Sequence, residues 1–135
     1  MGYAGITDYD VQFTSDPYFT YRSIEQIQNN LATKSCPISI SIINSPPTVD
    51  AGADFTIPSG TAYILKGMAT DKEGDFLTYC WEQNNSADNS QTEGNSRASL
   101  AKTLGPVYRS FLPTTSSNRC LPELSKVLAG ELTTD

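Results

Sequence analysis

Apolar residues recur at helical spacing in one stretch of the first quarter of the chain. Ile24, Ile27 and Leu31 are separated by polar residues, which places all three on one face of an α-helix. Ser23 precedes them and is followed three residues later by glutamine, the pattern of a capping box in which each side chain satisfies a free backbone N–H group. The sequence therefore predicts a helix over about residues 23–32. Its narrow apolar stripe needs a body to pack against.

Alternation of apolar and polar residues marks the clearest predicted strand, at residues 77–82. A second strand is predicted at residues 62–69. The acidic segment at residues 71–75 has the composition of a tight turn, because Gly74 is free to adopt a positive φ. The two strands and the turn together predict a hairpin. The side chains expected on its apolar face, and so in the core, are Leu65, Leu77, Tyr79 and Trp81.

Weaker patterns predict the other elements. Residues 55–57 and 107–111 each have the composition of a short strand. Isoleucine and serine alternate over residues 38–42, which fits either a strand or an extended linker. Residues 121–132 fit a short helix that Gly130 breaks. The side chains expected on the buried face of that helix are Leu124, Val127 and Leu128.

Proline-containing segments divide the chain. An Asn-Ser-Pro-Pro run at residues 44–47 biases the backbone towards extended geometry. We therefore expect a first segment at residues 1–36, a linker at residues 37–47 and a β-rich module at residues 48–135. Within the module, residues of about 84–99 are polar and bury too little surface to offset their ordering entropy, so we expect a disordered loop there.

The charge of the chain and the length of its apolar stretches together exclude two kinds of partner. The net charge is −6, and the nine Lys and Arg residues form no cluster, whereas binding to a phosphate backbone needs a basic patch. Nucleic acid is therefore not an expected partner. No stretch approaches the roughly 18 apolar residues that span a bilayer, so we expect no membrane span. The first residues also lack the basic and apolar regions of a signal peptide.

The chain contains no histidine. Without imidazole, these residues alone build neither a His-based triad nor the usual catalytic zinc site. The sequence also lacks a glycine-rich phosphate loop, a serine nucleophile elbow and paired carboxylates suited to glycoside hydrolysis. We therefore expect the chain by itself to be non-catalytic.

The six residues Met-Gly-Tyr-Ala-Gly-Ile at the start of the chain resemble the Met-turn of the metzincins, a clan of zinc metallopeptidases. The resemblance implies that Met1 supports the zinc-binding histidines of an intact enzyme. It also implies that Tyr3 can contact the metal or the developing oxyanion of the substrate. Residues 1–36, with their Ser-Asp-Pro-Tyr-Phe run and predicted helix, resemble the tail of the catalytic domain in bacterial reprolysin-like metallopeptidases.

A second resemblance begins at residues 47–54, Pro-Thr-Val-Asp-Ala-Gly-Ala-Asp. This run, with the acidic turn and the Tyr-Cys-Trp strand that follow it, resembles the polycystic-kidney-disease (PKD) modules, which have an immunoglobulin-like fold. The implied fold class is mostly β: an incomplete immunoglobulin/PKD-like sandwich, preceded by a loop and one α-helix from a metzincin C-terminal subdomain. Secreted bacterial proteases often carry such modules after the catalytic domain, and the two resemblances occur here in that order.

The sequence departs from both families in one respect each. The H-E-x-x-H segment that holds zinc in metzincins would lie upstream of Met1 and is absent from the chain. Only three or four strand candidates are present, against about seven in an immunoglobulin-like sandwich. We therefore expect a chain that is truncated at both ends, and a half-built sandwich of low stability that tends to associate.

The resemblance implies a non-catalytic fragment of a secreted or cell-surface zinc-dependent metalloendopeptidase. Its expected partners are the upstream catalytic domain of the same polypeptide, which would hold the zinc, and the protein substrates of that enzyme. The β module would be a spacer or a weak substrate-binding accessory. Two alternatives stay open: an extracellular adhesion or carbohydrate-binding β-sandwich module, in which Trp81 would be a sugar platform rather than a core anchor, and a spacer without any ligand.

Acidic residues near the predicted turn form a candidate calcium site. Asp71, Glu73 and Asp75, together with Asp50 and Asp54, could supply the oxygen ligands that calcium prefers. Their spacing does not match the EF-hand loop, and a solvated turn is the alternative interpretation.

The three cysteines show no metal-binding spacing. Cys80 could pair with Cys120, and Cys36 could pair with a cysteine of the upstream domain. Three buried thiols are the alternative, because connectivity is not deducible from sequence.

Overall fold

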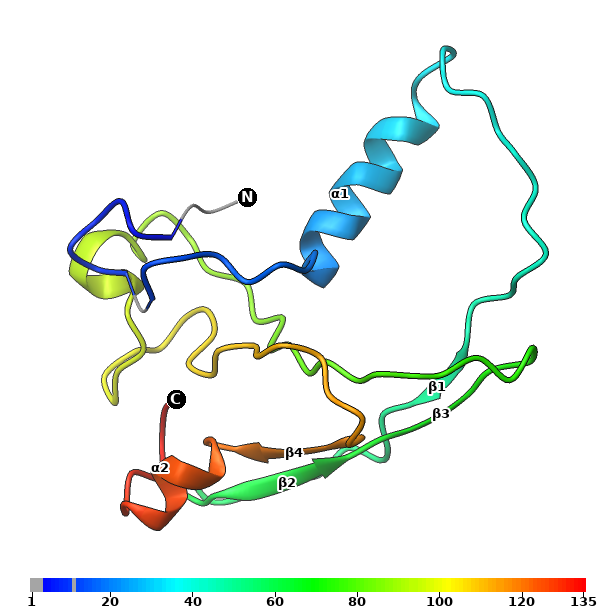
Figure 1. The fold of residues 1–135 in the computed structure, drawn as a ribbon. Coiled ribbons are helices and arrows are strands. Elements are labelled where there is room, and N and C mark those ends of the chain that lie inside the picture. The colour runs from blue at the N-terminus through cyan, green and yellow to red at the C-terminus, as the bar shows by residue number, and fades with distance from the viewer. Residues whose placement is uncertain (1–3, 11) are drawn as a thin grey trace.

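The computed structural model describes residues 4–10 and 12–135 as a chain with few regular elements (Figure 1). The main helix, α1, comes first, and a single 3-10 turn, η1, lies in the second half of the chain. The short helix α2 is close to the C-terminus. The bounds of the elements are α1 Tyr21–Ala32, β1 Thr48–Asp50, β2 Tyr63–Lys66, β3 Met68–Thr70, η1 Glu93–Ser96, β4 Asn118–Leu121 and α2 Leu124–Leu128.

The strands of the described part form two antiparallel sheets of two strands each, β1 with β3 and β2 with β4. Val49 faces Ala69 in the first sheet, and Ile64 faces Cys120 in the second. The strands β2 and β3 are separated in sequence by Gly67 alone. The chain therefore pairs with β4 before this glycine and with β1 after it. The structure is thus that of a mostly β chain with few helices, while an immunoglobulin/PKD-like sandwich stays a prediction.

The predicted hairpin between residues 62–69 and 77–82 is wrong. The first segment pairs with β1 and β4, whereas Tyr79 forms an isolated antiparallel bridge with Thr114, through N–H···O bonds of 2.7 and 3.0 Å. Alternation fixes which face of a strand is apolar but does not specify its partner. The partner residues lie before the predicted hairpin, at residues 48–50, and well after it, at residues 114 and 118–121.

Other predicted elements also need correction. Residues 55–57 and 107–111 are irregular rather than strands. Leu121 ends β4 as a buried residue instead of opening a helix, and α2 begins three residues later. Leu124 and Leu128 of that helix are exposed rather than inward, because a helix of five residues has little surface to bury. The 3-10 helix η1 lies within the predicted loop at residues 84–99, whose disorder stays a prediction.

Helix α1 agrees with its predicted position but begins earlier. The N-cap is Thr20, whose hydroxyl accepts a hydrogen bond from the Ser23 backbone N–H, so Ser23 lies inside the first turn rather than at the cap. Thr20 has extended backbone, with φ −68° and ψ 156°, which is the usual geometry of an N-cap. The predicted capping box at Ser23 is therefore wrong, and the helix gains two residues before it.

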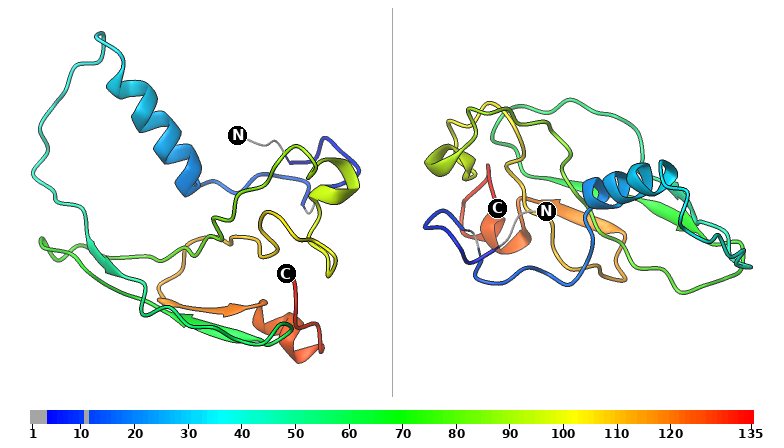
Figure 2. Two further views of the ribbon diagram at one scale, coloured as in Figure 1. Left: turned by 180° about the vertical axis from the view of Figure 1, so that it is seen from behind. Right: turned by 90° about the horizontal axis from the view of Figure 1, so that it is seen from above.

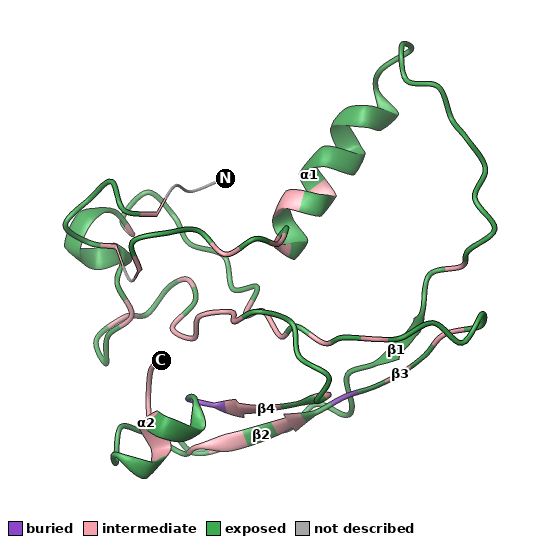
Figure 3. Ribbon diagram, viewed as in Figure 1, coloured by how far each residue is buried: buried purple, intermediate pink, exposed green. Residues whose placement is uncertain are grey.

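Little of the chain is buried. Among the described apolar side chains only Leu121 belongs to a core, beside the fully buried Pro122 (Figure 3). Helix α1 stands away from both sheets in Figure 1 and in the left view of Figure 2. Residues 38–42 form an exposed extended linker instead of a strand. The sheets and their loops therefore form a thin scaffold with extensive apolar surface.

Candidate functional site

Trp81 sits at the junction where β2 becomes β3. Its indole Nε1 donates a hydrogen bond of 2.9 Å to the Ser117 carbonyl oxygen, which also accepts a bond of 3.4 Å from the Gly67 N–H. The indole ring packs directly against Gly67. Trp81 is half-buried. Its ring contacts Gly67, and its one polar atom is hydrogen-bonded to Ser117.

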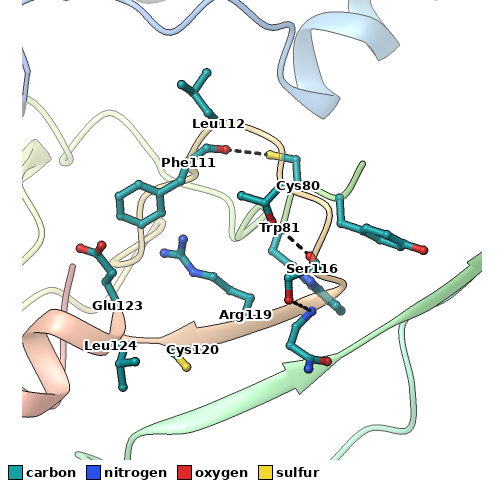
Figure 4. A pocket seen from close by; sticks show the side chains of 12 residues that line it. Cys80, Trp81, Phe111, Leu112, Ser116, Arg119, Cys120, Glu123 and Leu124 are labelled. Atoms are coloured by element: carbon teal, nitrogen blue, oxygen red, sulfur yellow. Dashed lines mark hydrogen bonds between the residues drawn. The ribbon is translucent and has the colours of Figure 1, made fainter. Parts of the chain in front are cut away.

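A small cavity of about 160 Å³ opens beside Trp81, between the Tyr79–Thr114 bridge and β4 (Figure 4). Phe111 and Leu112 from the loop before β4 face Cys80 across it. The first turn of α2 and its cap contribute Glu123 and Leu124. Sequence patterns alone do not bring these segments together, since more than 30 residues separate Cys80 from Phe111.

The centre of this cavity is occupied by the Arg119 side chain. Its guanidinium carbon lies 4.1 Å from the centroid of the Phe111 ring, and that of Arg109 lies 4.8 Å from the same centroid. Arg119 also donates to the Arg109 carbonyl oxygen at 3.1 Å and to Asp135 Oδ2 at 2.6 Å. The positive charge of Arg119 is therefore largely balanced within the chain, by cation–π contact and by ion pairing.

The Cys80 thiol is held as a neutral group. It donates a hydrogen bond of 3.3 Å to the Phe111 carbonyl oxygen. Burial raises the pKa of this thiol, and the negative charge of Glu82 raises it further. Burial likewise raises the pKa of the neighbouring Tyr18 phenol, which donates to the Ser110 hydroxyl. A thiol with a raised pKa is a weak nucleophile near neutral pH, and the chain has no histidine to deprotonate it.

A larger groove of about 1100 Å³ runs between the N-terminal segment on one side and residues 82–83 and 106–110 on the other. Its polar groups bond across the groove or within one side of it. The Glu82 carboxylate accepts from the Tyr21 N–H at 3.0 Å, and Gln83 Oε1 accepts from the Val107 N–H at 2.8 Å. Arg109, on one wall, donates to the Gln12 side chain on the other. We therefore interpret this groove as a packing seam rather than a reaction site.

The acidic residues of the candidate calcium site lie in separate local networks. Asp71 Oδ1 accepts from the N–H groups of Glu73 and Asp75, each at 2.9 Å. The Glu73 carboxylate accepts from the Ser45 hydroxyl at 3.0 Å, and Asp50 accepts from the Gly52 N–H at 2.8 Å. No group of three His, Cys, Asp or Glu residues in the described chain has a metal-binding arrangement. Calcium binding stays a prediction, and calorimetric titration with calcium tests it.

The structure places the other predicted residues unevenly. Met1 and Tyr3 lie outside the described residues. The predicted apolar set of Leu65, Leu77, Tyr79 and Trp81 is half-buried, while the residues between them are mostly exposed. All three cysteines are free thiols. In Figure 4 the Cys80 sulfur points to the Phe111 carbonyl, and Cys120 points away on the other side of Arg119.

Sequence reasoning missed Arg119, Phe111 and Asp135 as one cluster. No local signal marked Arg119, whose neighbour Asn118 is a residue type depleted in strands. The contacts of the cluster join residues up to 16 positions apart, which no local pattern encodes. None of the helices in the described residues is long and apolar enough to cross a membrane.

Comparisons with known proteins give no assignment. No family model matches the chain, and no curated protein or solved structure is significantly similar to it.

Proposed function

We propose that this chain is a non-catalytic part of a secreted zinc-dependent metalloendopeptidase. Residues 1–36 would be the end of its catalytic domain, and residues 48–135 would be a PKD-like accessory module with an immunoglobulin-like sandwich fold. The sequence resemblances at residues 1–6 and 47–54 motivate the proposal. The structural observation that supports the proposal is the exposure of the apolar face of helix α1.

Helix α1 presents an apolar stripe that nothing in the described chain covers. Ile24, Ile27 and Leu31 are 44%, 41% and 52% exposed. A stripe with period 3.6 is typical of a helix that packs on a larger body, and burying such side chains contributes about 1.5–3 kcal/mol each. An upstream catalytic domain of the same polypeptide would supply that body. The exposed stripe is thus what a helix separated from its domain would look like.

The residues of this chain do not fit a zinc site. Histidine is absent from the sequence, and the described Cys, Asp and Glu residues form no metal-binding group. In the proposed enzyme the zinc-binding histidines would all lie upstream, with Met1 as their support and with Tyr3 in contact with the metal or with the developing oxyanion of the substrate. The chain itself would contribute no histidine ligand and no general base.

The β module would act as a spacer or a weak substrate-binding accessory. A carbohydrate-binding role receives no support from Trp81, because its indole packs on Gly67 and its N–H group is bonded to Ser117. A sugar platform needs an open aromatic face. An accessory role for proteins rather than sugars therefore remains the better proposal.

Two experiments test the proposed function. The first incubates the isolated chain with a protein substrate and zinc, and we expect no cleavage; cleavage would show that the chain is catalytic. The second reads the open frame upstream of Met1. A frame that encodes H-E-x-x-H supports the peptidase, whereas a signal peptide directly upstream supports an adhesion module instead.

A third experiment tests the role of α1 in the polypeptide extended upstream. Ile27→Lys should place a charge in the packed stripe and lower both secretion yield and proteolytic activity. Gln28→Lys, one position along on the polar face, is the matched control and should change neither. Equal behaviour of the two variants would contradict the proposed packing.

A further inference from the structure

The linker between α1 and β1 exposes a run of isoleucines. Ile38, Ile40, Ile42 and Ile43 are 89%, 81%, 75% and 101% exposed. In Figure 1 and in the left view of Figure 2 this segment arcs away from the remainder of the chain. It contains no helix or strand, and the described chain offers its backbone N–H and C=O groups between residues 36 and 44 no hydrogen-bond partner.

The order of residues in this linker is symmetric. Residues 38–42 read Ile-Ser-Ile-Ser-Ile in both directions, with Ile40 at the centre. Side chains alternate between the two faces of an extended chain. An extended conformation therefore places the three isoleucines on one face and the two serines on the other.

From this pattern we propose that residues 38–42 form a self-association site for a second copy of the chain. The two linkers pair as antiparallel strands about a twofold axis at Ile40. Ile38 of one copy faces Ile42 of the other, and Ser39 faces Ser41. An isologous contact of this kind closes on itself, and it satisfies backbone groups on both copies at the same time.

The surroundings of the linker favour this pairing. Residues 35–49 contain no charged side chain, although the chain carries a net charge of −6, so two copies approach there with the least repulsion. Prolines at residue 37 and at residues 46–47 bound the uncharged strand, and they limit pairing to a short segment because proline has no N–H to donate. The stripe of α1 is also apolar, but its backbone groups are already bonded within the helix.

Sedimentation velocity of the full chain over a wide range of concentrations tests the proposal. We expect a concentration-dependent dimer, and we expect Ile40→Lys to remain monomeric throughout that range. Leu100→Lys is the matched control, because Leu100 and Ile40 are both 81% exposed. Ile27→Lys in α1 is a second control. The proposal is overturned if the chain stays monomeric, if Ile40→Lys still dimerises, or if either control abolishes the dimer.

Cross-linking tests the register of the pair. In a chain that carries Cys36→Ser, Cys80→Ser and Cys120→Ser, Ile40→Cys places two thiols across the twofold axis. Facing Cα atoms in antiparallel strands are about 4.5–5.5 Å apart, which lies within disulfide range. A copper–phenanthroline oxidant should therefore give a covalent dimer rapidly. Asn44→Cys in the same background should not, and faster cross-linking at residue 44 than at residue 40 would overturn the register.

Discussion

The Trp81 indole packs against Gly67 so closely that a Cβ atom at residue 67 would lie 3.0 Å from Trp81 Cζ2. The same Cβ would lie 3.4 Å from the Asp50 carbonyl oxygen in β1. Glycine at this position therefore lets the indole cover the point where β2 ends and β3 begins. Besides the direct chain connection at Gly67, this contact and the Ser117 carbonyl, which accepts from both residues, help to link the two small sheets.

Gly67→Ala should destabilise the chain by about 1–3 kcal/mol, the usual effect of overpacking a close contact. The indole must move away from the added methyl group and weaken its bond to Ser117. Trp81 fluorescence during urea unfolding measures the change. Gly94→Ala is the control, because its added Cβ would meet only Tyr9 at an ordinary 3.9 Å. Equal unfolding midpoints for the two variants would contradict the packing described for Gly67.

Asp135→Asn should lower the free energy of unfolding by roughly 3 kcal/mol, as expected when one partner of a buried ion pair loses its charge. The side chains of Arg119 and Asp135 are only 14% and 1% exposed, so water cannot replace the lost interaction. Glu131→Gln provides the comparison, since its ion pair with Lys126 is exposed and such pairs contribute little. Urea denaturation of both variants distinguishes the two ion pairs.

Thr20→Ala should lower the helicity of α1, because the N-cap hydroxyl contributes about 1 kcal/mol to a helix. Ser23→Ala should have a smaller effect, since it keeps the Ser23 backbone N–H that Thr20 caps and loses only the 3.1 Å contact between the Ser23 and Thr20 hydroxyls. Circular dichroism at low temperature measures the difference. A larger loss for Ser23→Ala would instead support a helix that begins at the capping-box position.

Alkylation of Cys80 should require a higher pH in the folded chain than in the unfolded chain. The thiolate is the reactive form, and burial raises the pKa of this thiol above its ordinary value of 9.0 in the folded chain. Peptide mass spectrometry after iodoacetamide treatment at a series of pH values gives the midpoint. In urea the midpoint should fall back towards the ordinary value, and an unchanged midpoint would show that the fold does not shield this thiol.

The same raised pKa predicts how stability varies with pH. The folded chain favours the protonated Cys80 thiol, so this contribution is complete below the unfolded pKa and disappears as pH rises through the folded pKa. Unfolding free energy should therefore decline above about pH 9. Cys80→Ser should remove the part of the decline that comes from this thiol, which urea titrations at several pH values can measure.

The isolated chain should have a low midpoint temperature of thermal unfolding. Leu121 is the one described apolar side chain in the core, and a chain that buries so little apolar surface gains little from the hydrophobic effect. Scanning calorimetry measures this directly. A sharp transition of a monomer above about 55 °C, within the range of ordinary domains, would contradict the thin scaffold described above.

Some features of this protein follow from local sequence. The helix around Ile24 to Leu31 could be predicted because helical spacing is a property of neighbouring residues. The alternation at residues 77–82 matches the alternation of half-buried and exposed side chains over residues 77–81, since that too depends only on the pleat of an extended chain, but none of these side chains reaches the core. The absence of histidine sets the limit on metal chemistry regardless of how the chain folds.

Only the tertiary structure determined which strands and side chains pair with one another. The pairing of Ile64 with Cys120, and of Tyr79 with Thr114, joins residues that are 35 or more positions apart. Arg119 and Asp135 acquire their roles only when those pairings bring Phe111 beside them. Local pattern specifies the face of a strand and the stripe of a helix, but contact between distant segments depends on how the whole chain minimises exposed surface and unsatisfied polar groups. That balance is a property of the folded chain, so no short window of sequence contains it.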